Sequence, residues 1–246
     1  MPRLSTTTSE RTLAPARGSG ARARSILWVR CAGLLAGCAL AAAAHAGAQI
    51  EEQLSDSVRT AMCKALSVPS EPERLHGRQP EVLAWLNDMS PRLASRMPDG
   101  RDRVALLTTI HYESVRAGLD PQLVLGLIQY ESAFRKYAVS SAGARGYMQV
   151  MPFWLRQLGG CTEQFAGTDP LFDTKANIRF GTVILRHYLD TESGDLFRAL
   201  GRYNGSLGRS EYPFGVLTTV ERYWTYVPRK TADSGATIAT VRDTVR

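Results

Sequence analysis

The sequence predicts a mainly α protein, in which a helical domain follows an N-terminal helical extension. Three observations indicate this class. Apolar residues recur at the spacing of one helical face in several segments, aspartates stand where those segments begin, and glycines stand where they end. The 246 residues also include a leader, so about two hundred are left to form one packed domain with additions.

The first elements after the leader are expected to be two helices joined by a linker. Apolar side chains from Ile50 to Leu66 lie at helical spacing, which predicts an amphipathic helix. Val68 to Pro80 is rich in proline and charge and is expected to be a linker. A short helix around Glu81 to Met89 is expected to end at Ser90-Pro91, because the residue before a proline disfavours the helical conformation.

Four further helices follow. The first helix is expected over Val104 to Val115. The second helix is expected to begin at Asp120-Pro121, with Asp120 as its N-cap and Pro121 as its first residue. Asp173 and Asp195 can cap the other two, the last of which is stopped at Gly205.

Two segments lack a clear helical pattern. Ser140 to Gly146 is rich in small residues and predicts a loop whose backbone can approach a ligand closely. Val216 to Tyr226 fits either a helix that buries Trp224 or an extended segment. The residues after Pro228 show no sustained apolar pattern and are expected to be disordered.

The first 48 residues predict a secretory leader. Six arginines precede an uncharged apolar stretch from Cys31 to Ala44, which is too short to span a bilayer comfortably. Small residues then favour cleavage after Ala48 and export to the periplasm or cell envelope. Leu35 to Cys38 also resembles a lipoprotein signal, which would lipidate Cys38 instead. The expected division is a leader at 1–48, an N-terminal helical segment at 49–103, the main helical domain at 104–213 and a C-terminal segment at 214–246.

The net charge and the spacing of the histidines argue against nucleic-acid binding and against a metal site. The leader carries six arginines and one glutamate, so its removal lowers the net charge from +7 to +2, and the high pI is no evidence for nucleic-acid binding. His76, His111 and His187 are scattered along the sequence, so we expect no metal site and no cofactor. Cys63 and Cys161 are the only cysteines after cleavage. In an oxidising compartment they would either pair or remain two buried thiols.

Glu131 is the residue that most clearly suggests chemistry. It continues the apolar face of Leu127 and Ile128, so its carboxyl should be buried or line a cleft. Burial would raise its pKa toward neutrality and suit it to be a general acid. The alternative is a boundary residue that reaches solvent or pairs with Arg135, four residues later.

Four sequence blocks stand out between Ala105 and Pro213. They are Glu131-Ser132, Gly143 to Pro152, Asn177-Ile178 with Gly181, and Ala199-Leu200 with Tyr203-Asn204-Gly205. In this order and spacing they resemble the soluble lytic transglycosylase (SLT) domain, the family-1 lytic murein transglycosylases. Gly-Tyr-Met-Gln stands at residues 146–149 where the family commonly has Gly-Leu-Met-Gln.

The resemblance implies a lysozyme-like helical fold and a lyase acting on the glycan strands of peptidoglycan. Such an enzyme cleaves the β-1,4 bond between N-acetylmuramic acid and N-acetylglucosamine without water and leaves a 1,6-anhydro ring. Glu131 would be its single catalytic acid and base. The sequence agrees, because ordinary glycosidases use two carboxylates and no acid lies between Glu131 and Glu163. Asp169 and Asp173 are better explained as turn and cap residues.

The resemblance also implies substrate-binding residues. Tyr203 would direct its hydroxyl at Glu131 or at the acetamido group of the sugar, whereas without the resemblance a core aromatic with a satisfied hydroxyl would be the preferred interpretation. The other implied substrate-binding residues are Ser140, Gln149, Met151 and Asn204. Two other functions stay open at this stage. A goose-type lysozyme would present the same glutamate to water, and an inactive glycan-binding scaffold would keep the fold alone.

Overall fold

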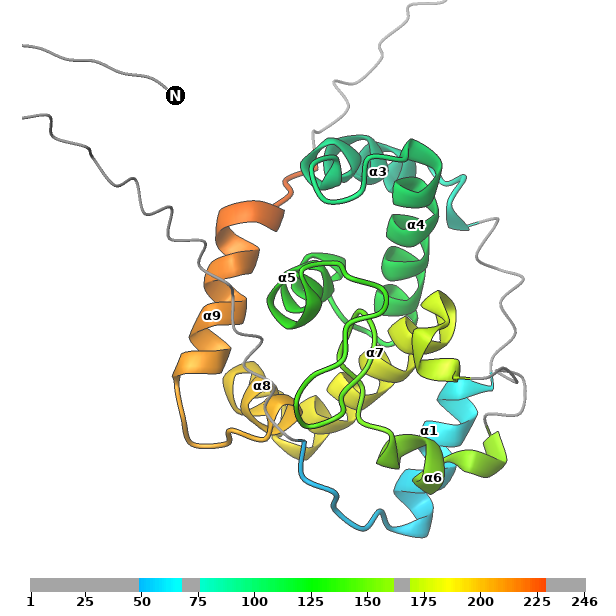
Figure 1. Ribbon diagram of the computed structural model, residues 1–246, viewed down its shortest axis with the longest axis vertical. Coiled ribbons are helices and arrows are strands. Elements are labelled where there is room, and N and C mark those ends of the chain that lie inside the picture. The colour runs from blue at the N-terminus through cyan, green and yellow to red at the C-terminus, as the bar shows by residue number, and fades with distance from the viewer. Residues whose placement is uncertain (1–48, 68–75, 162–168, 229–246) are drawn as a thin grey trace, which may run out of the picture. The chain divides into compact units, whose positions relative to one another are not determined.

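The structure, a computed structural model, describes residues 49–67, 76–161 and 169–228 (Figure 1). Helices dominate these ranges, in which extended pairing is limited to two isolated bridges, Val139 with Arg145 and Arg145 with Val150. The predicted mainly α class is confirmed. The helices are α1 (Asp56–Leu66), α3 (Pro80–Leu93), α4 (Gly100–Arg116), α5 (Pro121–Ser132), α6 (Phe153–Gln157), α7 (Thr174–Thr191), α8 (Leu196–Asn204) and α9 (Glu211–Thr219). Short turns are η1 (Gly159–Cys161), η3 (Pro170–Phe172) and η4 (Val220–Trp224).

Several predictions fall on residues that the structure does not describe. These are the leader at 1–48 with its alternative cleavage and lipidation sites, the linker from Val68 up to residue 75, Glu163, and the tail after Pro228. The predicted boundary between residues 103 and 104 falls inside α4.

Helix α5 is the most deeply buried short helix of the described chain. The six residues from Leu123 to Ile128 are all buried, and so are Glu131 and Ser132 in its last turn. Helix α5 packs against α4, α9 and η4, and Figure 1 shows it in the middle of the view. The close approach of α9 requires Gly215, because a Cβ there would overlap the ring of Tyr130 on α5.

The predicted aspartate caps are present. The side chains of Asp120, Asp173 and Asp195 accept hydrogen bonds from backbone N–H groups in the first turns of α5, α7 and α8, at 2.8, 2.9 and 3.0 Å. Gly205 ends α8 with φ of 76°, the left-handed conformation that glycine adopts without steric cost.

Two predicted helix boundaries are wrong. Helix α1 begins at Asp56, and Ile50 is 62% exposed in the extended segment before it. Helix α3 continues through Pro91 to Leu93, past the expected stop at Ser90-Pro91. Proline costs a helix one backbone hydrogen bond, and the complete burial of Leu93 offsets that loss.

The segment from Val216 to Tyr226 adopts the helical alternative as far as Trp224. Helix α9 passes into the π-helical turn η4, and Trp224 is 1% exposed. The indole N–H of Trp224 donates to the side-chain oxygen of Gln129 at 3.0 Å. This turn therefore holds the chain against α5 beyond the predicted end of the main domain.

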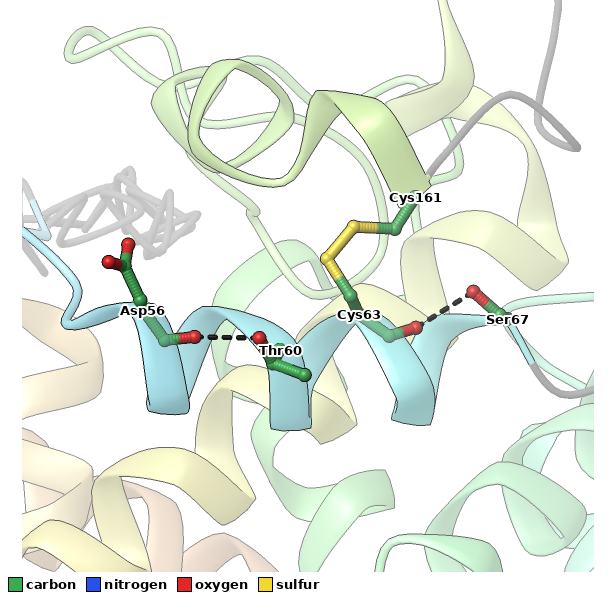
Figure 2. Close-up of a disulfide and its surroundings, with 5 residues drawn as sticks. All are labelled: Asp56, Thr60, Cys63, Ser67 and Cys161. Atoms are coloured by element: carbon green, nitrogen blue, oxygen red, sulfur yellow. Dashed lines mark hydrogen bonds between the residues drawn. A yellow bond between two sulfur atoms is a disulfide. The ribbon is translucent and has the colours of Figure 1, made fainter.

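The N-terminal helix is linked to the rest of the molecule by a disulfide. Cys63 of α1 and Cys161 of η1 are bonded, with their Cα atoms 5.3 Å apart (Figure 2). The sequence left open whether these two cysteines pair or remain buried thiols, and in the structure they pair.

Buried charges also hold α1 in place. Arg179 of α7 donates to Oε1 of Glu113 from Nε at 2.9 Å and from Nη2 at 2.7 Å, and both side chains are almost fully buried. Arg179 Nη1 also donates to the carbonyl of Leu66 at 3.2 Å, and Arg116 donates to the carbonyl of Ala65. The C-terminal end of α1 is therefore bound by two arginines that share one glutamate.

Candidate active site

Glu131 occupies the last turn of α5 and is 6% exposed. The next turn of helix does not form, because Ala133 and Phe134 have φ of 51° and 63°. Two successive non-glycine residues in the left-handed region are uncommon, and such strain often occurs at functional sites. Here the strained turn directs the chain from Arg135 onward along the surface next to the carboxyl group.

The surroundings of Glu131 keep its carboxyl protonated near neutral pH. Burial raises the pKa of Glu131 from 4.5 to about 8. The hydroxyl of Tyr212 donates to Oε1, which favours the carboxylate and lowers the pKa by a smaller amount than burial raises it. At pH 7 the group therefore carries a proton that it can give to a substrate.

The alternative in which Glu131 forms an ion pair with Arg135 does not occur. Within the described residues, Glu131 takes part in no salt bridge, and Arg135 Nε instead donates to the carbonyl of Ser132 at 3.0 Å.

A cavity of about 450 Å³ opens beside the carboxyl group. Glu131 is the only acid among its described lining residues, and two cations and two exposed apolar side chains complete most of its wall. Tyr137 is 71% exposed and Val139 is 60% exposed. The lining residues are Glu131, Arg135, Lys136, Tyr137, Ala138, Val139 and Gln149. Exposed aromatic and apolar surface beside a polar centre is typical of a ligand-binding groove.

The loop on the other side of the cavity is fixed by Asn177 of α7. Its side-chain oxygen accepts from the backbone N–H of Met148 at 2.8 Å, and its Nδ2 donates to the carbonyls of Arg145 and Leu171 at 2.9 and 2.8 Å. Gly146 allows this close approach, because a Cβ there would overlap the Asn177 amide and the Leu171 carbonyl oxygen. One buried side chain therefore satisfies three backbone groups and sets the position of Gln149.

Comparison with known families identifies this region. Residues 108–215 match the family model described as the transglycosylase SLT domain. Over these residues the chain is similar to the transglycosylase SLT family. The matched residues include Glu131, the loop held by Asn177, and Tyr212.

Two relatives match part of the chain. A transglycosylase of Enterobacteria phage PRD1 is 35% identical over 104 residues, which are 42% of this chain and 36% of the phage protein. Membrane-bound lytic murein transglycosylase C of Haemophilus influenzae (strain PittEE) is 31% identical over 112 residues, 42% of this chain and 31% of that protein. The chain thus spans about a third of the length of these relatives.

Among solved structures, the lytic transglycosylase Slt of Pseudomonas aeruginosa, determined as an inactive mutant, matches with 19% identity and a TM-score of 0.38. The match covers 72% of this chain and 36% of that chain.

The predicted substrate-binding residues of the SLT domain lie in different surroundings. Gln149 lines the cavity in the left-handed conformation, with φ of 49°, and its Nε2 donates to the Gly146 carbonyl at 2.8 Å. The hydroxyl oxygen of Ser140 accepts from the N–H of Ala144 at 3.0 Å and so stabilises the loop. Met151 is half-buried against the core, and Asn204 is 6% exposed in the last turn of α8.

Tyr203 differs from the expectation drawn from the resemblance. Its hydroxyl donates to the carbonyl of Met148 at 2.7 Å, and the side chain is 1% exposed. Tyr203 therefore supports the loop that contains Met148 from the buried side. The hydroxyl that reaches Glu131 belongs to Tyr212. Sequence reasoning did not identify Tyr212 as a site residue. It lies 81 residues from Glu131, and the only local signal is an aromatic residue at the start of a segment with mixed patterning.

The histidines are not all isolated in space. Nε2 of His76 lies 2.7 Å from Nδ1 of His111, and burial, followed by the neighbouring His76, lowers the pKa of His111 to about 4. The part of the chain that the structure describes contains no group of three metal-ligating side chains. A search of the same residues for a helix long and apolar enough to cross a membrane also found none.

Proposed function

We propose that this chain is a peptidoglycan lytic transglycosylase with Glu131 as its single acid and base. The observation that carries the proposal is a buried, protonated carboxyl at the wall of a 450 Å³ cavity whose described lining has no second acid. A glycosidase with two catalytic carboxylates would need another acid across the scissile bond. The nearby candidates serve elsewhere, since Asp169 pairs with Arg145 at 2.7 Å and Asp173 caps α7.

The proposed reaction has two proton transfers through one group. Glu131 first gives its proton to the glycosidic oxygen as the bond from that oxygen to C1 of the muramoyl residue breaks. The carboxylate then takes the proton of the muramoyl C6 hydroxyl while O6 bonds to C1. The products are a free hydroxyl on the leaving sugar and a 1,6-anhydro ring, and Glu131 ends protonated, ready for another cycle.

One feature of the site and one of the substrate suit this cycle. The hydrogen bond from Tyr212 becomes stronger when Glu131 is ionised, so it stabilises the intermediate carboxylate without making the acid too strong to be protonated at pH 7. In the family's usual account, the substrate's 2-acetamido oxygen stabilises the positive charge at C1, which replaces the second enzyme carboxylate. The substrate-binding roles of Ser140, Gln149, Met151, Tyr203 and Asn204 belong to this proposal.

The products of digestion test the proposal. Purified sacculi treated with the protein should release muropeptides with the mass of the 1,6-anhydro form. Products with a reducing-end sugar would show hydrolysis by water and contradict the transglycosylase reaction. Glu131→Gln should fold like the parent and lose at least about a thousandfold in rate, because an amide can neither give nor take the proton. Digestion by this variant at the parental rate would remove Glu131 from the mechanism.

We also propose that the protein works in the cell envelope after export. The leader pattern supports this location, as does the disulfide between Cys63 and Cys161, which would not persist in a reducing cytosol. The relatives named membrane-bound transglycosylases agree with it. N-terminal sequencing of the mature protein should begin at Gln49, whereas a lipid on Cys38 would contradict cleavage after Ala48.

A further inference from the structure

Two cationic side chains that line the cavity at Glu131 have no role in the proposed reaction. Arg135 and Lys136 line the same cavity as the catalytic carboxyl. Within the described residues neither takes part in a salt bridge, whereas Arg145 nearby pairs with Asp169 at 2.7 Å. With Glu131 protonated, the described wall of the cavity carries two positive charges and no negative charge.

Both cations are held at the groove by local contacts. Arg135 Nε donates to the carbonyl of Ser132 at 3.0 Å, and the interaction leaves the two terminal guanidinium nitrogens available for an acceptor. Lys136 Nζ lies 5.4 Å from the centre of the Tyr137 ring, a cation–π contact. The left-handed turn at Ala133 and Phe134 delivers both residues to this position.

A second cavity shares the lining residue Lys136 with the first. It has a volume of about 350 Å³, and Lys136 lines both cavities. Residues of α4 and of the start of α7 form much of its wall, including Asp102, Leu106, Asp173 and Thr174. Lys136 therefore lies at the wall of both cavities, and the two acids of the second cavity, Asp102 and Asp173, do not line the cavity at Glu131.

The substrate class offers a matching anion. The muramoyl residue carries a lactyl ether that ends in a carboxyl group. That carboxylate is free in a strand stripped of its peptides, and in an intact strand it is amide-linked to a stem peptide that has carboxylates of its own. Arginine binds a carboxylate through two parallel hydrogen bonds, and lysine adds a point charge.

We propose that Arg135 and Lys136 form a carboxylate-binding site that recognises the acidic branch of the muramoyl residue. The proposal rests on the proposed function and adds a preference: the groove distinguishes muramoyl strands from neutral polymers of N-acetylglucosamine. Both residues are specificity-determining, since they would contact the branch and not the reacting atoms.

Binding to the uncut substrate tests the site separately from catalysis. The full mature chain with Glu131→Gln serves as the parent for calorimetry, so that no ligand is cleaved. Arg135→Gln and Lys136→Gln are added together, and a control adds Arg209→Gln and Lys64→Gln, two exposed cations that line neither cavity. The ligands are soluble strands with stem peptides, strands stripped by an amidase, and neutral chitohexaose.

The cation double variant should bind at least one muramoyl strand about tenfold or more weakly, because a hydrogen bond to a charged group contributes enough for such a change. Its affinity for chitohexaose should stay within about twofold of the parent, and the control should bind all three ligands like the parent. If only the affinity for intact strands falls, the bound carboxylate belongs to the stem peptide. If only the affinity for stripped strands falls, it belongs to the lactyl group. If both affinities fall, the site accepts either carboxylate.

Parental affinity for both muramoyl strands would overturn the proposal, as would an equal loss for chitohexaose. Failure of the proposed function would look different. In that case the enzyme with Glu131 intact would release no anhydro product, while the difference in affinity between muramoyl and neutral ligands would persist.

Discussion

Burial of Glu131 couples its protonation to folding. Its pKa is about 8 in the folded chain against an ordinary value of 4.5, so the folded state binds the proton more tightly. The stability that this proton contributes is therefore fully present below pH 4.5 and is lost as the pH rises toward 8. A glutamine at the same position is neutral at every pH.

The free energy of unfolding of Glu131→Gln should accordingly rise relative to that of the parent between about pH 5 and pH 8, and the difference should level off above the folded-state pKa. Its full size is at most about 5 kcal/mol, because one pKa unit corresponds to about 1.4 kcal/mol. Urea titrations across this range would measure it, with the exposed Glu221→Gln as the control. A difference that does not change with pH would show that the carboxyl is not desolvated.

Tyr212 is a positioning residue for the same carboxyl. Its hydroxyl bond lowers the pKa of Glu131, so Tyr212→Phe should raise that pKa above about 8 and move the alkaline limb of the pH–rate profile upward. The rate at pH 7 should fall about tenfold, because the carboxylate formed during the reaction loses a charge-assisted hydrogen bond.

Tyr130→Phe is the matched control for this prediction. Tyr130 packs edge-on against Tyr212 with ring centres 5.3 Å apart, and no hydrogen bond joins it to Glu131 within the described chain. This variant should keep the parental pH profile. If Tyr212→Phe lowers the rate without moving the profile, its role is only to pack the helix.

At the scale of elements, the loop from Gly143 to Pro152 and helix α7 act as one unit joined by Asn177. Gly146→Ala and Gly143→Ala distinguish the cost of a steric overlap from the cost of the backbone conformation. Both glycines have positive φ, 76° and 86° respectively, so both variants incur the conformational cost. A Cβ at residue 143 meets open space, whereas one at residue 146 overlaps Asn177.

Gly143→Ala should therefore cost about 1–2 kcal/mol of stability through its backbone conformation alone. Gly146→Ala should cost at least about 3 kcal/mol, because it also displaces hydrogen bonds of a buried side chain. Urea unfolding would measure both values, and activity should fall only for Gly146→Ala, since Gln149 moves with the loop. Equal costs would mean that the contact with Asn177 is not needed.

The elements also show what sequence can and cannot predict. Caps such as Asp120 and Asp173 are local signals, because each side chain bonds to a backbone group two or three residues away. Glu131 was identifiable for the same reason, as an acid on an apolar helical face. The hydroxyl of Tyr212 and the partner of Tyr203 depend on how α9 and α8 pack against distant segments, and no local pattern records such contacts. The stop expected at Pro91 failed because burial of Leu93 outweighed a local preference.

At the scale of the whole molecule, the segment from Gln49 to Leu66 is bound to the SLT domain at several points. The indole of Trp154 donates to the side chain of Gln49 at 2.8 Å, and the disulfide joins Cys63 to Cys161. Since Arg179 and Arg116 also hold the carbonyls at the end of α1, this helix has non-covalent anchors that do not depend on the disulfide.

Replacement of both cysteines by serine should therefore destabilise the protein without releasing α1. The disulfide closes a separation of 98 residues, and its loss should lower the free energy of unfolding by roughly 2–5 kcal/mol, mainly by freeing the unfolded chain. Hydrogen exchange should still find the amides of α1 protected at moderate temperature, and peptidoglycan digestion should persist because neither cysteine lines the cavity at Glu131. The parent in reductant should match the double variant, whereas loss of protection throughout α1 would show that the buried arginines cannot hold the helix by themselves.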